Sequence, residues 1–188
     1  SDLFMELNRK IKTRKSVRKF SPRKPNWRDI IECIDSTRYA PMAGNNFSLK
    51  FIIVDDKEKI EKIAEASEQD FINRAQFVVV VCSNPSRTLT AYGERGKDYL
   101  KQQAGAAIEN FLLAIQDKKL ATCWIGYFKP SQIKRELRIP DDIEIEALFP
   151  IGYETGSTKK KEKIDIDSIL YFNEYKQKRM KPLKKIEV

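Results

Sequence analysis

The 188-residue sequence predicts a sandwich of helices on a sheet, either α+β or α/β, from three observations. The unbroken run Phe77–Cys82 is rich in β-branched residues and is typical of a strand buried on both faces. The stretch Gln102–Leu120 has helical periodicity over an apolar arc so wide that we expect a central, covered helix. Further predicted strands alternate with helices along the chain. The inward stripe of the central helix is formed by Ile108, Phe111, Leu112 and Ile115.

The amino-terminal part predicts two helices and a strand. Leu3–Lys12 is amphipathic, with its leucines and an isoleucine on one side. Asn26 is a candidate N-cap for a helix that ends near Thr37. We expect this second helix to carry four apolar residues inward, namely Trp27, Ile30, Ile31 and Ile34.

The rest of the chain continues the alternation of strands and helices. Asn84–Gly96 has no apolar period and is predicted to be a loop. Pro130 suits the first turn of a short helix that ends at Leu137, and Ile143–Tyr153 alternates as a half-buried strand. The other expected elements are strands at Leu49–Val54 and Ala121–Ile125, a helix at Lys57–Ala66, and its continuation at Gln69–Asn73.

Composition excludes several kinds of chemistry. Histidine is absent, which excludes a Ser-His-Asp triad and a histidine-bound zinc, and no metal site is expected. Cys33, Cys82 and Cys123 lie far apart in apolar surroundings, so we expect buried thiols in a reducing, cytoplasmic protein. No apolar run is long enough to span a membrane. Any reactivity should therefore come from a bound cofactor.

The net charge of +9 is concentrated at the two ends of the chain. Residues 1–28 carry ten basic and two acidic side chains, and residues 157–188 carry ten and five, whereas the body between them is acidic. If the basic ends meet, they form an anion site, but two solvated tails would explain the same pattern. The charge also leaves open a nucleic-acid-binding protein. We do not expect nucleic acid as the partner, because the basic residues are not interleaved with exposed aromatic residues.

The segment Arg14-Lys15-Ser16-Val17-Arg18-Lys19-Phe20 is the strongest candidate for binding a small molecule. It offers two guanidinium groups, an ammonium group and a hydroxyl within five residues, with no carboxylate among them. Such donors suit a phosphate together with a carbonyl-rich ring. The alternative is a solvated basic loop, and the spacing alone does not decide between them.

Four stretches, taken in order, resemble the FMN-dependent nitroreductase family over roughly residues 8–172. The basic segment at 14–20 resembles the family's amino-terminal Arg-x-Ser-x-Arg/Lys-x-Phe/Tyr motif. Ala40-Pro41-Met42-Ala43-Gly44-Asn45 is similar to its Ala-Pro-Ser-x-x-Asn loop. Residues 120–126 (Leu-Ala-Thr-Cys-Trp-Ile-Gly) and 150–153 (Pro-Ile-Gly-Tyr) resemble its Leu-Gly-Thr-x-Trp-Ile-Gly segment and its last strand.

The resemblance implies an α+β sandwich with a mostly antiparallel central sheet flanked by helices, in an intertwined homodimer that binds FMN at sites made by both subunits. The family-like domain would cover residues 1–172. Residues 173–188 would be a basic extension, and the surface of a second subunit is a candidate for what this extension packs against.

The resemblance also assigns residues to the cofactor. The basic segment would hold the phosphate, the ribityl chain and the pyrimidine edge, and the 41–45 loop would contact the flavin from the other subunit. Trp124, Ile125 and Gly126 would flank the ring, with a backbone N–H near Ile125 or Gly126 directed at flavin N5. Lys161 and Lys163 would reach the phosphate, and Gln69 would lie near the ring. The implied set is Arg14, Lys15, Ser16, Arg18, Pro41, Met42, Ala43, Asn45, Gln69, Trp124, Ile125, Gly126, Lys161 and Lys163.

The implied activity is ping-pong hydride transfer from NAD(P)H through the flavin to a flat, electron-poor acceptor such as a nitroaromatic compound or a quinone. The sequence departs from the family pattern after Asn45, where Phe47 replaces a Gln and Leu49 replaces a Trp. A same-family dehalogenase or dehydrogenase therefore remains an alternative, as does a flavin carrier without turnover. Four aromatic residues could form a lid over the ring, and the alternative is that they pack in the ordinary way. They are Phe47, Tyr92, Tyr127 and Phe128.

Overall fold

The structure, a computed structural model, describes residues 2–180. It divides into two units between Thr158 and Lys159. The predicted domain boundary at 172/173 stays a prediction, and residues 181–188 of the predicted extension lie outside the described residues. In its described part, residues 159–180, the second unit carries one short helix, α7 (Ile166–Ile169).

The first unit is built on a four-stranded sheet of β1 (Leu49–Val54), β2 (Phe77–Ser83), β3 (Ala121–Thr122) and β4 (Glu144–Gly152). The strand order is β1-β2-β4-β3, and each neighbouring pair is antiparallel. The class is therefore α+β with an antiparallel sheet, as predicted.

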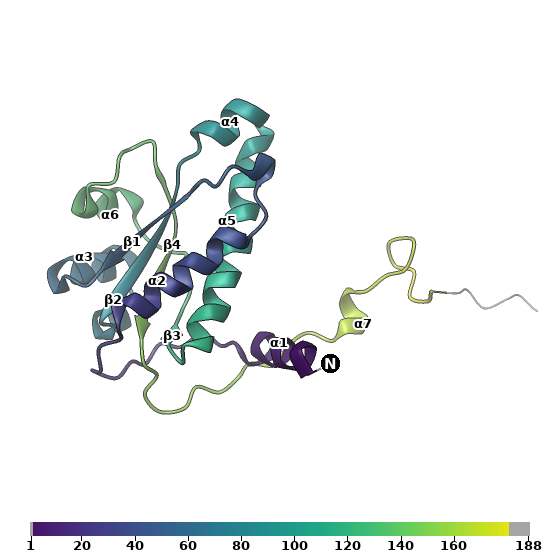
Figure 1. Ribbon diagram of the computed structural model, residues 1–188, viewed down its shortest axis with the longest axis horizontal. Coiled ribbons are helices and arrows are strands. Elements are labelled where there is room, and N and C mark those ends of the chain that lie inside the picture. Colours follow the sequence, from purple (N-terminus) through teal and green to yellow (C-terminus); the bar gives the residue numbers. More distant parts are fainter. Residues whose placement is uncertain (1, 181–188) are drawn as a thin grey trace, which may run out of the picture. The chain divides into compact units, whose positions relative to one another are not determined.

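Helices cover both faces of the sheet (Figure 1). The helices α2 (Trp27–Asp35) and α5 (Arg95–Asp117) pack on one face, and α3 (Lys57–Ser67) and α6 (Pro130–Leu137) pack on the other. Because side chains alternate along a strand, Val79 and Val81 of β2 belong to the first core while Val78 and Val80 belong to the second. The prediction of a strand buried on both faces is confirmed, since every residue of β2 is buried.

The central helix is confirmed, although α5 begins seven residues before the predicted start. Ile108, Phe111, Leu112 and Ile115 are all buried on its inward face. The prediction of a loop at 84–96 is wrong, because Ser86–Tyr92 forms the helix α4. Gly96 allows α5 to begin close beside α4, since a Cβ there would lie 2.9 Å from the carbonyl oxygen of Thr88. This polar stretch has no apolar period that could have revealed the helix.

Three other predictions need correction. The strand expected at 121–125 ends at Thr122, and only a single bridge from Ile125 to Leu148 continues it. The strand β4 is buried from Ala147 onward rather than half-buried, because it lies between β2 and β3 and is covered by helices on both faces. Trp27 and Ile31 of α2 are 47% and 45% exposed, not inward.

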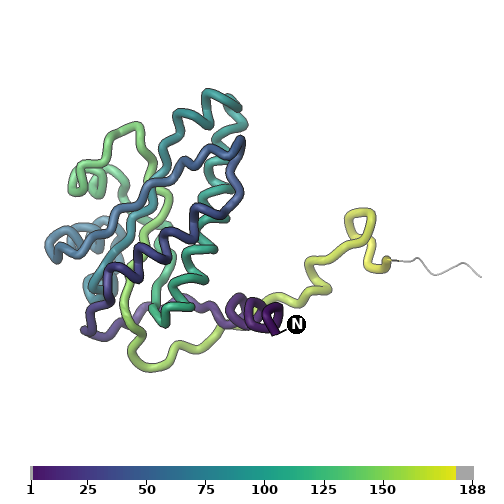
Figure 2. The backbone as a smooth tube through the Cα atoms, viewed as in Figure 1, coloured from purple at the N-terminus to yellow at the C-terminus, as the bar shows by residue number. Residues whose placement is uncertain are grey.

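The helix α1 (Asp2–Thr13) has no buried residue. Its C-terminal end is held on α5 by Gln116, whose Nε2 donates to the carbonyl oxygen of Lys10 and to Thr13 Oγ1. Three short 3₁₀ turns complete the unit, at Ser36–Tyr39, Ala43–Asn45 and Asp70–Arg74. Figure 2 shows the backbone path of these connections.

Candidate functional site

A backbone hydrogen bond places the basic segment beside the tryptophan-containing segment. The Val17 N–H donates to the carbonyl oxygen of Thr122 at 2.9 Å, and Val17 is buried. Val17 therefore lies beside Thr122, although more than 100 positions of sequence separate them. The strand pairs Ala121–Gly152 and Thr122–Ile151 add the motif at 150–153, so three of the four predicted motifs come together in one chain.

Carboxylates approach the basic segment, contrary to the expectation from its local sequence. The Lys15 ammonium lies 2.9 Å and 3.0 Å from the two carboxylate oxygens of Glu154. Glu154 also accepts the backbone N–H of Thr158 at 2.8 Å. Burial opposes the charged carboxylate, but the hydrogen bonds from Lys15 and Thr158 outweigh it and lower the pKa of Glu154.

The two arginines differ in their surroundings. Arg14 Nε lies 3.7 Å from Glu109 on α5, which is a long contact. Arg18 is exposed and makes no ion pair or hydrogen bond through its side chain within residues 2–180. Ser16 is half-buried between them. The segment therefore presents at least one guanidinium group whose donors are unused in the described chain.

The residues after β3 combine an exposed ring with an unused backbone donor. Trp124 is 43% exposed, and its ring packs edge-on against Phe149 at a centroid distance of 5.7 Å. Ile125 is buried, and its N–H and carbonyl oxygen are both bonded to Leu148. The Gly126 N–H makes no hydrogen bond within the described residues. Of the two N–H groups considered from the sequence, only that of Gly126 is available.

The predicted loop at 41–45 has an unusual backbone. Gly44 and Asn45 have φ values of 59° and 55°, in the left-handed region that glycine and asparagine tolerate best. The Ala43 N–H donates to Gln103 Oε1 of α5 at 3.1 Å, which fixes the loop on the central helix. Pro41 and Asn45 are exposed, while Met42 and Ala43 are half-buried.

The loop and the basic segment occupy different parts of α5. The loop is held by Gln103, whereas Thr13 and Arg14 are held by Gln116 and Glu109. Gln103 and Glu109 are six positions apart, which places the contacts of the loop and of Arg14 about 9 Å apart along the helix and on different sides of it. Gln116, which holds Thr13 at the end of α1, lies about 20 Å along the helix from Gln103. Figure 1 shows α1 and the segment after α2 beside opposite ends of α5. No hydrogen bond or ion pair among residues 2–180 joins these two predicted parts of the site.

A hollow of about 610 Å³ lies between the loop and the start of α5. Tyr92 and Tyr99 pack edge-to-face on one another at 5.3 Å in its wall. Its lining consists of Pro41, Met42, Ala43, Tyr92, Tyr99, Gln102, Gln103 and Ala106. The loop residues predicted to contact a cofactor thus share a cavity with an aromatic pair.

The four predicted lid residues do not gather in one place. Phe47 lines a separate hollow of about 320 Å³, while Tyr92 lines the one described above. Tyr127 is 63% exposed, and Phe128 is half-buried against the core on the α3 and α6 face. No ring contact joins them within residues 2–180. Phe128 therefore follows the alternative reading of ordinary packing.

The remaining predicted residues lie elsewhere. Gln69 is half-buried at the start of the 3₁₀ turn Asp70–Arg74, where its N–H donates to Ala64. Lys161 and Lys163 are exposed and belong to the second unit. Burial raises the pKa of Cys33 to about 12 and that of Cys82 to about 11, so neither thiol is suited to act as a thiolate.

Two further structural findings concern metal ions and membranes. No cluster of acidic, histidine or cysteine side chains among residues 2–180 could hold a metal ion. None of the helices in this part of the chain is long and apolar enough to cross a membrane.

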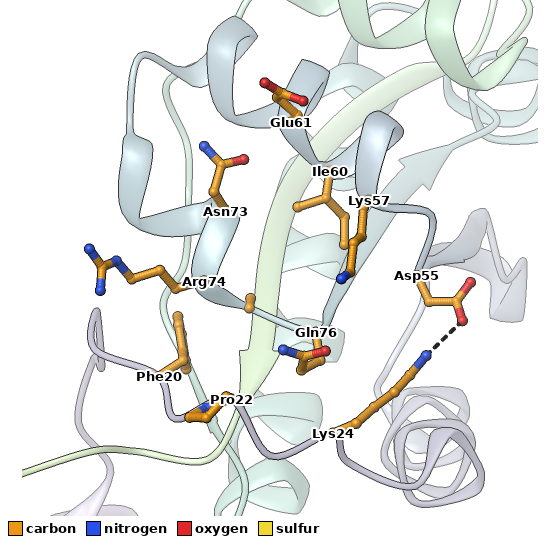
Figure 3. A pocket seen from close by; sticks show the side chains of 11 residues that line it. Phe20, Pro22, Lys24, Asp55, Lys57, Ile60, Glu61, Asn73, Arg74 and Gln76 are labelled. Carbon is orange, nitrogen blue, oxygen red and sulfur yellow. Dashed lines mark hydrogen bonds and ion pairs between the residues drawn. The ribbon is translucent and has the colours of Figure 1, made fainter.

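A third hollow, of about 580 Å³, was not predicted (Figure 3). It lies between the segment Phe20–Lys24, the start of α3 and the turn before β2. Figure 3 shows Lys24 and Asp55 directed toward one another, at 3.0 Å, and Arg74 on the opposite side. Because both acidic and basic side chains line it, this hollow has no strong preference for an anion.

Sequence reasoning missed two residues that organise the site, Glu154 and Gln103. Glu154 follows the motif at 150–153 directly, but nothing in the sequence pairs it with Lys15. Gln103 could have been found, because it falls on the same helical stripe as Ala107 and Phe111, where a polar residue is unexpected.

Comparison with known proteins gives one consistent result. The sequence pattern of the nitroreductase family matches residues 11–70 and 64–153. A provisionally named NADH dehydrogenase/NAD(P)H nitroreductase from Archaeoglobus fulgidus is 31% identical over 148 residues, covering 76% of this chain and 82% of the relative. An iodotyrosine deiodinase from Thermotoga neapolitana is 25% identical over 160 residues, covering 76% and 85%.

Solved structures agree with the sequence matches. A nitroreductase family protein from Clostridium novyi NT is 29% identical with a TM-score of 0.73, covering 92% of this chain and 96% of that chain. An FMN-dependent nitroreductase from Clostridium difficile R20291 is 22% identical with a TM-score of 0.76, covering 88% and 98%. The second likeness supports the fold alone.

The ion pair of Glu154 with Lys15 should make stability depend on pH. In the folded protein the pKa of Glu154 lies below its ordinary 4.5, so its contribution is present above that value and is lost as pH falls through the folded pKa. We expect Glu154→Gln to lower the free energy of unfolding by about 1 kcal/mol near neutral pH and by progressively less in acid. Urea unfolding at a series of pH values measures this, with the exposed Glu61→Gln as control. A stability difference between Glu154→Gln and the wild type that does not change with pH would contradict a stabilising ion pair between Glu154 and Lys15.

Proposed function

Because this chain belongs to the nitroreductase family of oxidoreductases, we propose that it is a homodimeric, FMN-dependent NAD(P)H oxidoreductase. The observation that carries the proposal is the hydrogen bond from Val17 to Thr122, which joins the basic segment to the stretch that contains the exposed Trp124 and the Gly126 N–H, a donor without a hydrogen bond within residues 2–180. When bound, FMN would take a hydride from NAD(P)H and pass it to an electron-poor acceptor such as a nitroaromatic compound or a quinone.

The donors of this chain fit such a group. Arg18 has unused guanidinium donors, Arg14 has only a long contact to Glu109, and Ser16 adds a hydroxyl. These suit a phosphate and the carbonyl edge of a flat ring. Lys15 would contribute positive charge while Glu154 holds its ammonium in place. In the second unit, Lys161 and Lys163 are further candidates for the phosphate.

Gly126 would supply the backbone donor beside the ring. Its N–H makes no hydrogen bond in the part of the chain that the structure describes, and the buried Ile125 before it is fixed by two hydrogen bonds to Leu148. A donor held by a rigid neighbour needs no rearrangement to form a hydrogen bond, here to flavin N5. Arginine on the opposite edge would stabilise the negative charge that reduction places on the ring.

The second subunit is part of the proposal because the 41–45 loop and the basic segment contact different sides of α5, and no hydrogen bond or ion pair joins them within residues 2–180. A site that needs both would be completed by another copy of the chain. Uncovered apolar side chains supply surface for such a contact, since a monomer rarely exposes so many together. They are Leu3, Phe4, Met5, Leu7 and Ile11 of α1 and Trp27 and Ile31 of α2.

A second candidate function is a dehalogenase of the same family. It is favoured by the similarity to the Thermotoga neapolitana iodotyrosine deiodinase and by the departures at Phe47 and Leu49. Halotyrosines and nitroaromatic compounds assayed side by side, with NADH and NADPH, would separate the two candidates.

The first test of the proposal is the colour of the protein. We expect the purified protein, reconstituted with FMN, to be yellow and to lose its visible absorbance when NAD(P)H is added without oxygen. Addition of a quinone should restore the colour. Protein that takes up no FMN would overturn the proposal, whereas bound flavin that NAD(P)H leaves oxidised would favour a flavin carrier.

The Gly126 N–H can be removed without changing side-chain chemistry elsewhere. Gly126→Pro lacks the donor, while Gly126→Ala keeps it and serves as the matched control. Loss of one useful hydrogen bond should slow reduction of bound FMN by about tenfold. Stopped-flow absorbance measures this rate, and equal rates for the two variants would exclude the N–H from a role.

Subunit sharing predicts complementation between two inactive variants. Arg18→Glu damages the basic segment and Pro41→Glu damages the loop, and both positions are exposed, so each variant should fold. After unfolding and refolding an equal mixture, random pairing would give mixed dimers with one intact site each, or roughly one quarter of the wild-type activity. A mixture as inactive as its components would show that one chain supplies both parts.

A further inference from the structure

Gln103 is a buried amide on an otherwise apolar helix face. It is 5% exposed, and the other buried residues of α5 are apolar or glycine. A buried amide without partners is strongly destabilising, so a glutamine at this position needs hydrogen bonds. Leucine or methionine would fill the same space without that requirement.

Both ends of the Gln103 amide are used, and both bind the same loop. Its Oε1 accepts the Ala43 N–H at 3.1 Å, and its Nε2 donates to Ser48 Oγ at 2.7 Å. Ser48 is buried, and its carbonyl oxygen accepts the Asn84 N–H at 2.8 Å. One side chain therefore joins the beginning and the end of the segment 43–48 to the central helix.

The loop needs such a restraint because its own backbone bonds are few. Within it, the Asn45 N–H donates to Met42 at 2.9 Å and the Asn46 N–H to Ala43 at 3.2 Å. Two successive residues, Gly44 and Asn45, hold positive φ values, which is unfavourable for a residue with a side chain such as Asn45. Without the amide, other loop conformations would compete with this one.

We propose that Gln103 is a positioning residue that holds the loop Pro41–Ser48 in the shape required to contact the cofactor of the partner subunit. The inference rests on the proposed function for what the loop contacts, but the restraint itself rests on the two hydrogen bonds. Gln103 also lines the hollow that Met42 shares with Tyr92 and Tyr99, so the same bonds fix one wall of that hollow.

Three variants test this role. Gln103→Met keeps the volume and removes both hydrogen bonds. Gln103→Glu is the rescue, because a carboxyl group can accept from Ala43 and can keep a hydrogen bond with the Ser48 hydroxyl in either protonation state. Asn110→Leu is the matched control, since it removes a side-chain amide bond from the same helix to a different segment, at Ser36.

Two measurements on the full-length protein give independent answers. Hydrogen exchange of residues 41–48 in flavin-free protein should be faster in Gln103→Met only, and wild-type-like in Gln103→Glu and Asn110→Leu. The dissociation constant of FMN, from quenching of its fluorescence, should rise about tenfold in Gln103→Met only. A wild-type loop and a wild-type FMN constant in Gln103→Met would overturn the inference.

The outcomes separate this inference from the proposed function. If wild-type protein binds no FMN, the proposed function fails, while the exchange data still decide whether Gln103 restrains the loop. If wild-type protein binds FMN and Asn110→Leu weakens binding as much as Gln103→Met does, the effect is one of general stability and the positioning role is excluded.

Discussion

The structure depends on the burial of α5 against the sheet along one stripe, which leaves its ends and its other sides to hold separate pieces of chain. Ile108, Phe111 and Ile115 bind the helix to β2 and β4 through the core. Gln103, near the middle of the helix, binds the 41–48 loop, and Gln116, near its C-terminal end, binds the end of α1. Because the helix is rigid, it keeps the two pieces of chain that it holds apart from one another.

The charges around the basic segment follow from the same arrangement. Several cations within five residues repel one another, and Glu154 and Glu109 reduce that repulsion for Lys15 and Arg14. Arg18 is left without such a partner among the described residues. The segment is thus ordered before any ligand arrives, yet it retains a cation whose attraction for an anion is not already satisfied. Such preorganisation lowers the entropic cost of binding.

Much of the fold could be predicted because the signals were local. The β-branched run of β2 and the apolar stripe of α5 each report burial directly. The helix α4 was missed because its polar sequence has no apolar period. Its place depends on the close approach of α5 that Gly96 allows and on contacts such as that of Tyr92 with Gly44, which is distant in sequence. Trp27 and Ile31 were placed inward because an apolar stripe predicts burial without saying in which chain the covering surface lies. The pairing of Lys15 with Glu154 joins residues 139 positions apart, which no local pattern encodes.

The contrast between Gln103 and the aromatic residues shows which kind of side chain defines a site in this fold. Phe47, Tyr92, Tyr127 and Phe128 were grouped by residue type, but packing distributes them over separate surfaces because apolar contacts are not directional. A buried amide is directional, and its two hydrogen bonds select one arrangement of the loop out of many. Gln103 therefore links the conformation of the 41–48 loop to the wall of the neighbouring hollow, because the same side chain lines that hollow and holds the loop.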